Sequence, residues 1–348
     1  MKTITEITNS NEYNFLRTNP HLKDKLIFLT FGGSHAYGTN TPNSDTDIRG
    51  CALNSKEDIL TLNNFEQVID NTTDTTIYSF NKLIQLLCNC NPNCIELLGC
   101  KPEHYLIYNE VGKEMLANRK MFLSGKAVNS FGGYANQQLR RLQNAVARDA
   151  LNQPEKERHM LLSMKNMMMT FDERYSAFPQ GGIELFIAES DKEDMETEIF
   201  MNINLKNYPL RDCKSMLNEM QEIIKVYGKL NHRNNKKEEA GLNKHAMHLI
   251  RLYLMAIDIF EKEEIITYRE NDLPMLMEIR NGKYMNEDGT YQAEFFEMVD
   301  NLEKQLHYAQ ENSSLPTSCN MKQVNEFVAS VNEKVILGRI KNSILGFY

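Results

Sequence analysis

The chain has 348 residues, of which 41% are hydrophobic and 25% are charged. This length is enough for two domains, and this composition is typical of a chain with a packed core. The formal net charge of -8 excludes a protein that coats nucleic acid through a generally basic surface, because such binding needs many Lys and Arg contacts to phosphates. A local basic groove remains compatible with it.

The N-terminal residues, MKTITEITNSNEYNFL, contain no apolar segment of the kind found in signal peptides. The longest apolar run, HLIRLYLMAIDIF, is interrupted by Arg251 and is too short to cross a bilayer. The seven cysteines follow no regular spacing, which favours reduced thiols. We therefore expect a cytoplasmic protein that does not associate with membranes. The sequence does not indicate an oligomeric state.

The first hundred residues alternate strand-like and helix-like patterns. Residues 26–31, LIFLTF, form a short apolar run that ends at glycines and predicts a buried strand. A second strand is expected within residues 47–53, DIRGCAL. Ser79 is placed to cap a helix, and residues 91–99, NPNCIELLG, predict a further helical turn.

After about residue 112 the pattern changes to long helix-periodic segments with little glycine or proline. Two strand-like segments, GGIELFIA and ETEIFMNINL, interrupt them and predict a small β-hairpin. The expected fold class is therefore α+β. A domain with a mixed sheet flanked by helices spans residues 1–112, and a mainly helical domain that carries the hairpin spans residues 113–348.

The most informative stretch is FGGSHAYGTNTPNSDTDIRG, residues 31–50. Asp45 and Asp47 are two residues apart, so on a strand their carboxylates would share one face and repel each other unless a cation lay between them. Mg²⁺ prefers such oxygen ligands. Gly33 and Ser34 offer backbone amides and a hydroxyl without side-chain bulk, as a triphosphate requires. An Asp-x-Asp alone is more often an exposed turn, but the order of strand, Gly-Ser, polar loop and paired acids is a longer constraint.

This order resembles the signature of the DNA polymerase β superfamily of nucleotidyltransferases. The longer string GSHAYGTNTPNSDTDIRG resembles one branch of that superfamily, the RNA-repair-associated (RlaP-like) nucleotidyltransferases of bacteria and their phages. Three further strings match the same branch: FGGYANQQLRRL, NPNCIELLG and LNKHAMHLIRL. The resemblance thus covers most of the chain, with the first motif the most specific.

The resemblance implies a nucleotidyltransferase domain over residues 1–112. In such enzymes, Mg²⁺ or Mn²⁺ ions on three carboxylates help an acceptor hydroxyl to attack the α-phosphate of an NTP such as ATP, and pyrophosphate leaves. Asp45 and Asp47 match the paired metal ligands, and Gly33 with Ser34 matches the turn that holds the phosphates. Asp74 is the first candidate for the third catalytic and metal-binding carboxylate, with Asp70 and Glu96 as alternatives.

Other residues are candidates for phosphate binding. Lys244, His248 and Arg251 have helical spacing and would form one cationic face, although an ordinary solvated face has the same pattern. Arg49 would share the strand face of the two aspartates, either to touch a phosphate or to form a structural salt bridge.

We expect an enzyme that transfers a nucleotide to RNA, with the NTP and RNA as its partners. Two alternatives remain open. The same site could modify a protein hydroxyl, as AMPylating toxin-like members of the superfamily do, or the protein could be an inactive nucleotide-binding module. The retention of two mutually repelling acids argues against the inactive module.

Overall fold

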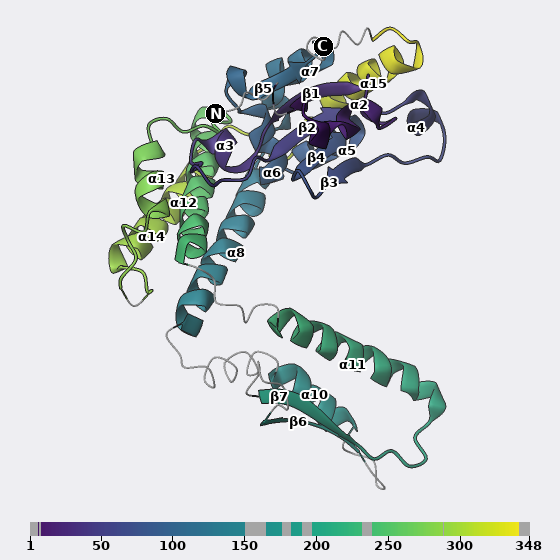
Figure 1. Cartoon of the computed structure of the whole chain (residues 1–348), viewed down its shortest axis with the longest axis vertical. Helices are drawn as coiled ribbons and strands as arrows, with labels where there is room; N and C mark the ends of the chain where they lie inside the picture. Colours follow the sequence, from purple (N-terminus) through teal and green to yellow (C-terminus); the bar gives the residue numbers. More distant parts are fainter. Residues whose placement is uncertain are drawn as a thin grey trace. The chain divides into compact units, whose positions relative to one another are not determined.

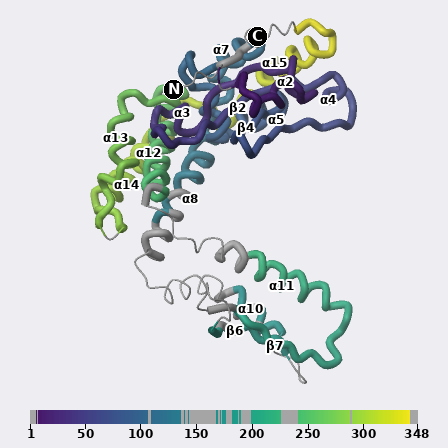
Figure 2. Tube along the Cα trace, viewed as in Figure 1, coloured from purple at the N-terminus to yellow at the C-terminus, as the bar shows by residue number. Residues whose placement is uncertain are grey.

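The computed structural model describes residue 6 and residues 8–149, 165–175, 182–189, 197–231, 239–287 and 289–340. The chain divides into two compact units, the first formed by Met1–Arg140, Asn243–Tyr284 and Ala293–Tyr348, and the second by Arg141–Leu242 and Met285–Gln292. Compact units and folding domains are different divisions, so the boundary expected at residue 112 stays a prediction. Figures 1 and 2 trace the chain by residue number.

A five-stranded mixed sheet forms the centre of the first unit, with the strand order β3-β4-β2-β1-β5 (Figure 1). β2 and β4 are parallel, and the other neighbours are antiparallel. The apolar run of the sequence forms β1, whose first five residues are buried, as expected for a strand covered on both faces. The strands are β1 (Leu26–Phe31), β2 (Ile48–Ala52), β3 (Gln67–Asp70), β4 (Thr75–Ser79) and β5 (Tyr105–Tyr108).

Helices and N-terminal residues cover the sheet. α5 (Phe80–Cys88) packs against β2 and β4, and α7 (Glu110–Ala117) packs against β1 and β5. As predicted, Ser79 caps α5, because its hydroxyl accepts a hydrogen bond from the Lys82 amide at 3.3 Å. A buried cluster joins residues before β1 to the sheet, and its members include Tyr13, Leu16, Leu22, Leu29, Ile48 and Ile77.

The remaining helices of the first unit are α2 (Phe15–Thr18), α3 (Gly33–Tyr37), α4 (Lys56–Leu60), α6 (Pro92–Ile95), α13 (Leu273–Arg280), α14 (Ala293–Glu311) and α15 (Met321–Ile336). Short 3-10 helices are η1 (Asn11–Tyr13), η2 (Glu96–Leu98), η3 (Pro102–His104) and η4 (Arg119–Phe122). Two of the four boundaries between the units fall within the long helices α8 (Lys126–Asp149) and α12 (Glu239–Lys262), and the other two flank Met285–Gln292.

The second unit contains the predicted hairpin, formed by the antiparallel strands β6 (Ile183–Glu189) and β7 (Thr197–Ile203). α10 (Lys165–Tyr175) packs against β6 and α11 (Leu210–Asn231). Buried side chains of these elements form a core of its own, which includes Met168, Phe171, Ile183, Met216 and Ile223. The acidic turn expected between the two strands lies mostly outside the described residues.

The expected fold class is confirmed: a mixed sheet with flanking helices is followed by a mainly helical region with a small two-stranded sheet. The sequence analysis did not single out the edge strands β3 and β5. Within the described residues, no helix is both long and apolar enough to cross a membrane.

Candidate active site

Two neighbouring parallel strands bring Asp47 and Asp74 together. Ile48 at the start of β2 pairs with Thr75 at the start of β4, and the Ile48 amide donates a hydrogen bond to the Asp74 carbonyl at 3.3 Å. Asp47 and Asp74 each directly precede one of the paired residues. The sheet register therefore places both carboxylates at the same sheet edge, although 27 positions separate them in the sequence.

The Gly-Ser turn reaches the same edge from β1. Phe31 at the end of β1 pairs with Ile48, and the Gly32 amide donates to the Asp47 carbonyl at 2.9 Å. Gly33 has a φ of +53°, and a β-carbon there would lie 1.8 Å from Asp47 Oδ2. Glycine is therefore required at position 33 both for its backbone conformation and for its close approach to the carboxylate.

The next residue, Ser34, is buried in the first turn of α3. A helix start leaves its first backbone amides without partners inside the helix. The predicted phosphate-holding turn thus lies beside Asp47, and its phosphate contact stays a prediction.

A single arginine bridges the two facing carboxylates. Arg49 Nη2 lies 2.9 Å from Asp74 Oδ1 and 3.5 Å from Asp47 Oδ1. Arg49 Nη1 also donates to the backbone carbonyl of Asp74. Of the two roles expected for Arg49, the structure therefore has the salt bridge, and a phosphate contact stays a prediction.

The carboxylates of Asp47 and Asp74 lie close enough for a hydrogen bond between them, so the pKa of each depends on the other. Burial raises the pKa of Asp47 to about 7, and this hydrogen bond adds to the rise while Arg49 opposes it. The same bond lowers the pKa of Asp74. Two carboxylates can bond in this way only when one carries a proton. Without a further cation, the pair therefore favours a shared proton over two full negative charges.

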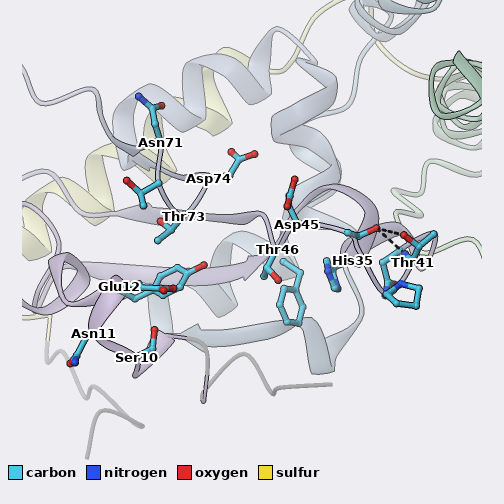
Figure 3. A pocket seen from close by; sticks show the side chains of 16 residues that line it. Ser10, Asn11, Glu12, His35, Thr41, Asp45, Thr46, Asn71, Thr73 and Asp74 are labelled. Carbon is cyan, nitrogen blue, oxygen red and sulfur yellow. Dashed lines mark hydrogen bonds between the residues drawn. The ribbon is translucent and has the colours of Figure 1, made fainter. Parts of the chain in front are cut away.

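Asp45 and Asp74 line a cleft of about 1330 Å³. Figure 3 shows these two side chains reaching the cleft from separate loops. The loop before Asp45 is folded by Ser44, whose hydroxyl accepts from the Thr41 amide at 2.8 Å and lies 3.1 Å from the Thr41 hydroxyl. Because β2 begins only at Ile48, Asp45 and Asp47 lie in a loop. The expectation that strand alternation aligns them is therefore wrong.

The donor set of this edge fits a hard divalent cation. Asp45, Asp47 and Asp74 supply only oxygen ligands, which Mg²⁺ and Mn²⁺ accept, and a cation between Asp47 and Asp74 would offset the repulsion between their charges. Among the described residues, no three acidic, histidine or cysteine side chains are gathered closely enough to hold a metal ion together. The metal role of these aspartates therefore stays a prediction.

The cationic face expected on α12 is only partly present. Lys244 is exposed, and its charge lowers the pKa of both Asp47 and Asp74, which places it near them. His248 is half-buried, one helical turn further on. The expectation that Arg251 shares an exposed face is wrong, because its side chain is 1% exposed.

Arg251 belongs to a buried network. Its Nη1 lies 3.1 Å from Glu96 Oε2, and its guanidinium stacks 3.5 Å from the centre of the Tyr37 ring. Arg251 Nη2 lies 3.1 Å from His248 Nδ1. Since arginine has no acceptor, His248 Nδ1 accepts this hydrogen bond. The network therefore helps to fix the orientation of the His248 ring through its Nδ1 atom.

The two alternatives for the third carboxylate have structural contacts of their own. Glu96 is buried and is engaged by Arg251 and by the Tyr37 hydroxyl at 2.8 Å. Asp70 Oδ1 accepts hydrogen bonds from the amide and hydroxyl of Thr73, at 2.9 and 3.0 Å. The geometry therefore favours Asp74, which alone of the three is bonded to Asp47.

The cleft includes residues that the sequence analysis did not single out. Its walls include Ser10–Tyr13 and Asn71–Thr73, and Arg280 of α13 reaches Ser44 at 3.4 Å. Only the fold brings these segments together, and no local motif marks them. Charge periodicity could not have found Arg280, which is 236 positions away from Ser44.

Comparison with known proteins connects this site to a family. Residues 2–168 match the model of the RNA repair pathway DNA polymerase beta family, RlaP. A protein of Enterobacteria phage T4, described as an uncharacterized 38.9 kDa protein in the nrdC-mobD intergenic region, is 24% identical over 315 residues, or 83% of this chain and 91% of that protein. No solved structure matches the chain. The matched residues 2–168, just under half of the chain, contain the whole five-stranded sheet and the three aspartates, and over this region the chain is similar to the RNA repair pathway DNA polymerase beta family.

Proposed function

We propose that this protein is a divalent-metal-dependent nucleotidyltransferase that moves an NMP from an NTP to a hydroxyl group of RNA. The similarity of residues 2–168 to that family supports a polymerase-β-like nucleotidyltransferase role in RNA repair. The metal, the nucleotide and the RNA hydroxyl are the finer part of the proposal.

The observation that carries the proposal is the pairing of Asp47 with Asp74 next to Gly33. Two carboxylates in hydrogen-bonding contact cost free energy at neutral pH, since either repulsion or a retained proton must be accommodated. Arg49 compensates part of this charge, and a divalent cation would use both carboxylates. Asp45 adds a third carboxylate from the adjoining cleft.

In the proposed reaction the acceptor oxygen bonds to the α-phosphorus as the bond from that phosphorus to the bridging oxygen breaks. Pyrophosphate leaves, and the hydroxyl proton passes to a carboxylate or to water. A divalent cation would supply positive charge to the phosphate oxygens. Asp74 is more open to an acceptor hydroxyl than Asp47, because its side chain is 58% exposed while that of Asp47 is 19% exposed.

The chain's own residues would position the substrate. Gly33 and Ser34 would lie against the phosphates, and Asp45, Asp47 and Asp74 would hold the cation. Lys244 and His248 would contribute from α12. Arg251 has no direct role in this proposal, because its charge is directed to Glu96.

A label-transfer assay tests the proposal. The protein is incubated with each α-³²P-labelled NTP, Mg²⁺ or Mn²⁺, and either RNA or cell lysate, and the labelled product is separated. We expect label on RNA from the wild type. The Asp45→Asn/Asp47→Asn double variant should give background, while Asp24→Asn, at an exposed position outside the cleft, should behave like the wild type. Label on protein alone would identify a protein-modifying enzyme, and no label with any acceptor would contradict transfer.

A further inference from the structure

Arg280 ends α13 beside the loop that carries the acidic motif. Its Nη2 lies 3.4 Å from the Ser44 hydroxyl, near the outer limit of a hydrogen bond. Its Nη1 is buried and has no hydrogen-bond partner. Burial lowers the pKa of Arg280, and no neighbouring charge contributes to that shift. This guanidinium is therefore partly desolvated without a counter-ion.

The other half-buried or buried arginines of the described residues have strong acceptors. Arg49, Arg251 and Arg269 each pair with at least one carboxylate. Arg17 donates to the backbone carbonyls of Thr8 and Ser10. Arg280 differs from all of these, because its single contact is a neutral hydroxyl.

An uncompensated guanidinium inside a protein is costly, since its desolvation is offset by neither an ion pair nor good hydrogen bonds. Such a cost is expected where a ligand completes the site. Guanidinium groups bind phosphate oxygens especially well, through paired charge-assisted hydrogen bonds. The chemistry of the missing partner is therefore that of a phosphate.

The position of Arg280 indicates which phosphate it meets. Ser44 directly precedes Asp45 and lines the same cleft. The residue two positions after Arg280, Gly282, packs against α12, where an added β-carbon would lie 2.9 Å from Asn243 Nδ2. Asn243 is followed by Lys244, whose charge reaches Asp47 and Asp74. Arg280 and Lys244 are thus cations on adjoining elements beside the acidic site.

We propose that Arg280 binds the triphosphate of the nucleotide substrate, with its guanidinium donating to a phosphate oxygen next to Ser44. This inference rests on the proposed function and assigns a residue to the same site. The inference assigns Arg280 to the nucleotide rather than to the backbone of a nucleic acid. Among the described residues, no lysine or arginine lines the cleft itself, while its lining includes Glu12, Asp45 and Asp74.

Equilibrium binding tests the assignment without any transfer. Wild type, Arg280→Gln and Arg280→Lys are titrated with a non-hydrolysable NTP and with inorganic tripolyphosphate, each with Mg²⁺. Arg280→Gln should weaken the binding of both ligands by about tenfold or more, as expected for the loss of a charge-assisted hydrogen bond. The affinities of Arg280→Lys should lie between those of the wild type and Arg280→Gln, because lysine keeps the positive charge and lacks the paired donors of the guanidinium. Arg119→Gln, at an exposed position in η4, is the matched control and should bind like the wild type.

The melting temperature of the ligand-free protein separates binding from a structural role. A cation in the last turn of a helix can stabilise it through the helix dipole, so a structural Arg280 would lower the melting temperature when changed to Gln. For a ligand-binding Arg280 we expect an unchanged or higher melting temperature, with a smaller rise when nucleotide is added.

The outcomes distinguish this inference from the proposed function. Arg280-dependent nucleotide binding without label transfer would support Arg280 and contradict transfer. Transfer with unchanged nucleotide binding in Arg280→Gln would overturn the role of Arg280 and leave the function standing. Weakened RNA binding together with unchanged nucleotide binding in Arg280→Gln would also overturn the assignment of Arg280 to the triphosphate.

Discussion

A β-carbon on Gly33 would lie 1.8 Å from Asp47 Oδ2, so the backbone of one residue and the carboxylate of the other occupy adjoining space. Gly33→Ala must therefore displace Asp47 and also adopt a φ of +53°. We expect this variant to lose about 1–2 kcal/mol of stability. We also expect it to bind Mg²⁺–nucleotide more weakly, because the displaced carboxylate no longer faces Asp74. Urea unfolding and isothermal titration measure the two effects.

Gly133→Ala is the matched control, because an added β-carbon there meets nothing within 4 Å. Gly133 lies in α8, so alanine should stabilise the helix by about 0.5–1 kcal/mol and leave binding unchanged. Equal nucleotide affinity in Gly33→Ala and the wild type would contradict the contact between Gly33 and Asp47 as a requirement of the site.

The third carboxylate can be identified with two charge-removing variants. Asp74 has a φ of +43°, which asparagine tolerates better than alanine. Asp74→Asn should abolish label transfer while leaving the melting temperature nearly unchanged. Asp70→Asn keeps an acceptor for the Thr73 amide and should retain transfer. Full activity in Asp74→Asn, together with loss in Asp70→Asn, would move the ligand to Asp70.

The buried pair of Arg251 and Glu96 should stabilise the fold. Arg251→Met leaves the Glu96 carboxylate buried without its cation, and we expect a loss of about 3–5 kcal/mol. The double variant Arg251→Met/Glu96→Gln should regain part of the lost stability, because no unpaired buried charge then remains. The urea midpoints of the two variants test this. An unchanged midpoint together with a raised KM for the nucleotide would show instead that Arg251 contacts the substrate.

His104 should make stability depend on pH. Burial between Phe31 and Tyr268 lowers the pKa of His104 from its ordinary 6.5, and its Nδ1 has no hydrogen-bond partner. The folded protein therefore binds fewer protons here than the unfolded chain. This contribution to the free energy of unfolding is present above pH 6.5 and is lost as the pH falls below it. His104→Phe should flatten the fall of the melting temperature between pH 7 and 5.5, and an identical slope in both proteins would contradict this.

Much of the sheet could be predicted because its signals are local. The continuous apolar run of β1 and the capping position of Ser79 need only neighbouring residues to be read. β3 could not be recognised, because this four-residue edge strand alternates exposed and half-buried positions and half of its residues are polar. Edge strands gain their structure from the partner strand more than from their own pattern.

The part of the candidate site that lies in one continuous loop could be predicted from the sequence. Gly33, Asp45 and Asp47 belong to one short motif, and the structure places them around one sheet edge. By contrast, helical periodicity assigned Arg251 to an exposed face because it cannot show that Glu96, 155 positions away, meets the same helix. The contact of Arg280 with Ser44 could not be predicted for the same reason. Contacts between distant segments depend on the tertiary fold, which charge spacing along a helix does not encode.

A crystal structure with Mn²⁺ and a non-hydrolysable NTP tests the central claim most directly, since anomalous scattering locates the metal. The account predicts a peak at about 2.0–2.3 Å from carboxylate oxygens of Asp45, Asp47 and Asp74, with the triphosphate beside Gly33 and Ser34. A peak elsewhere, or none, with Arg49 still bridging Asp47 and Asp74 and nucleotide absent from the cleft, would contradict it.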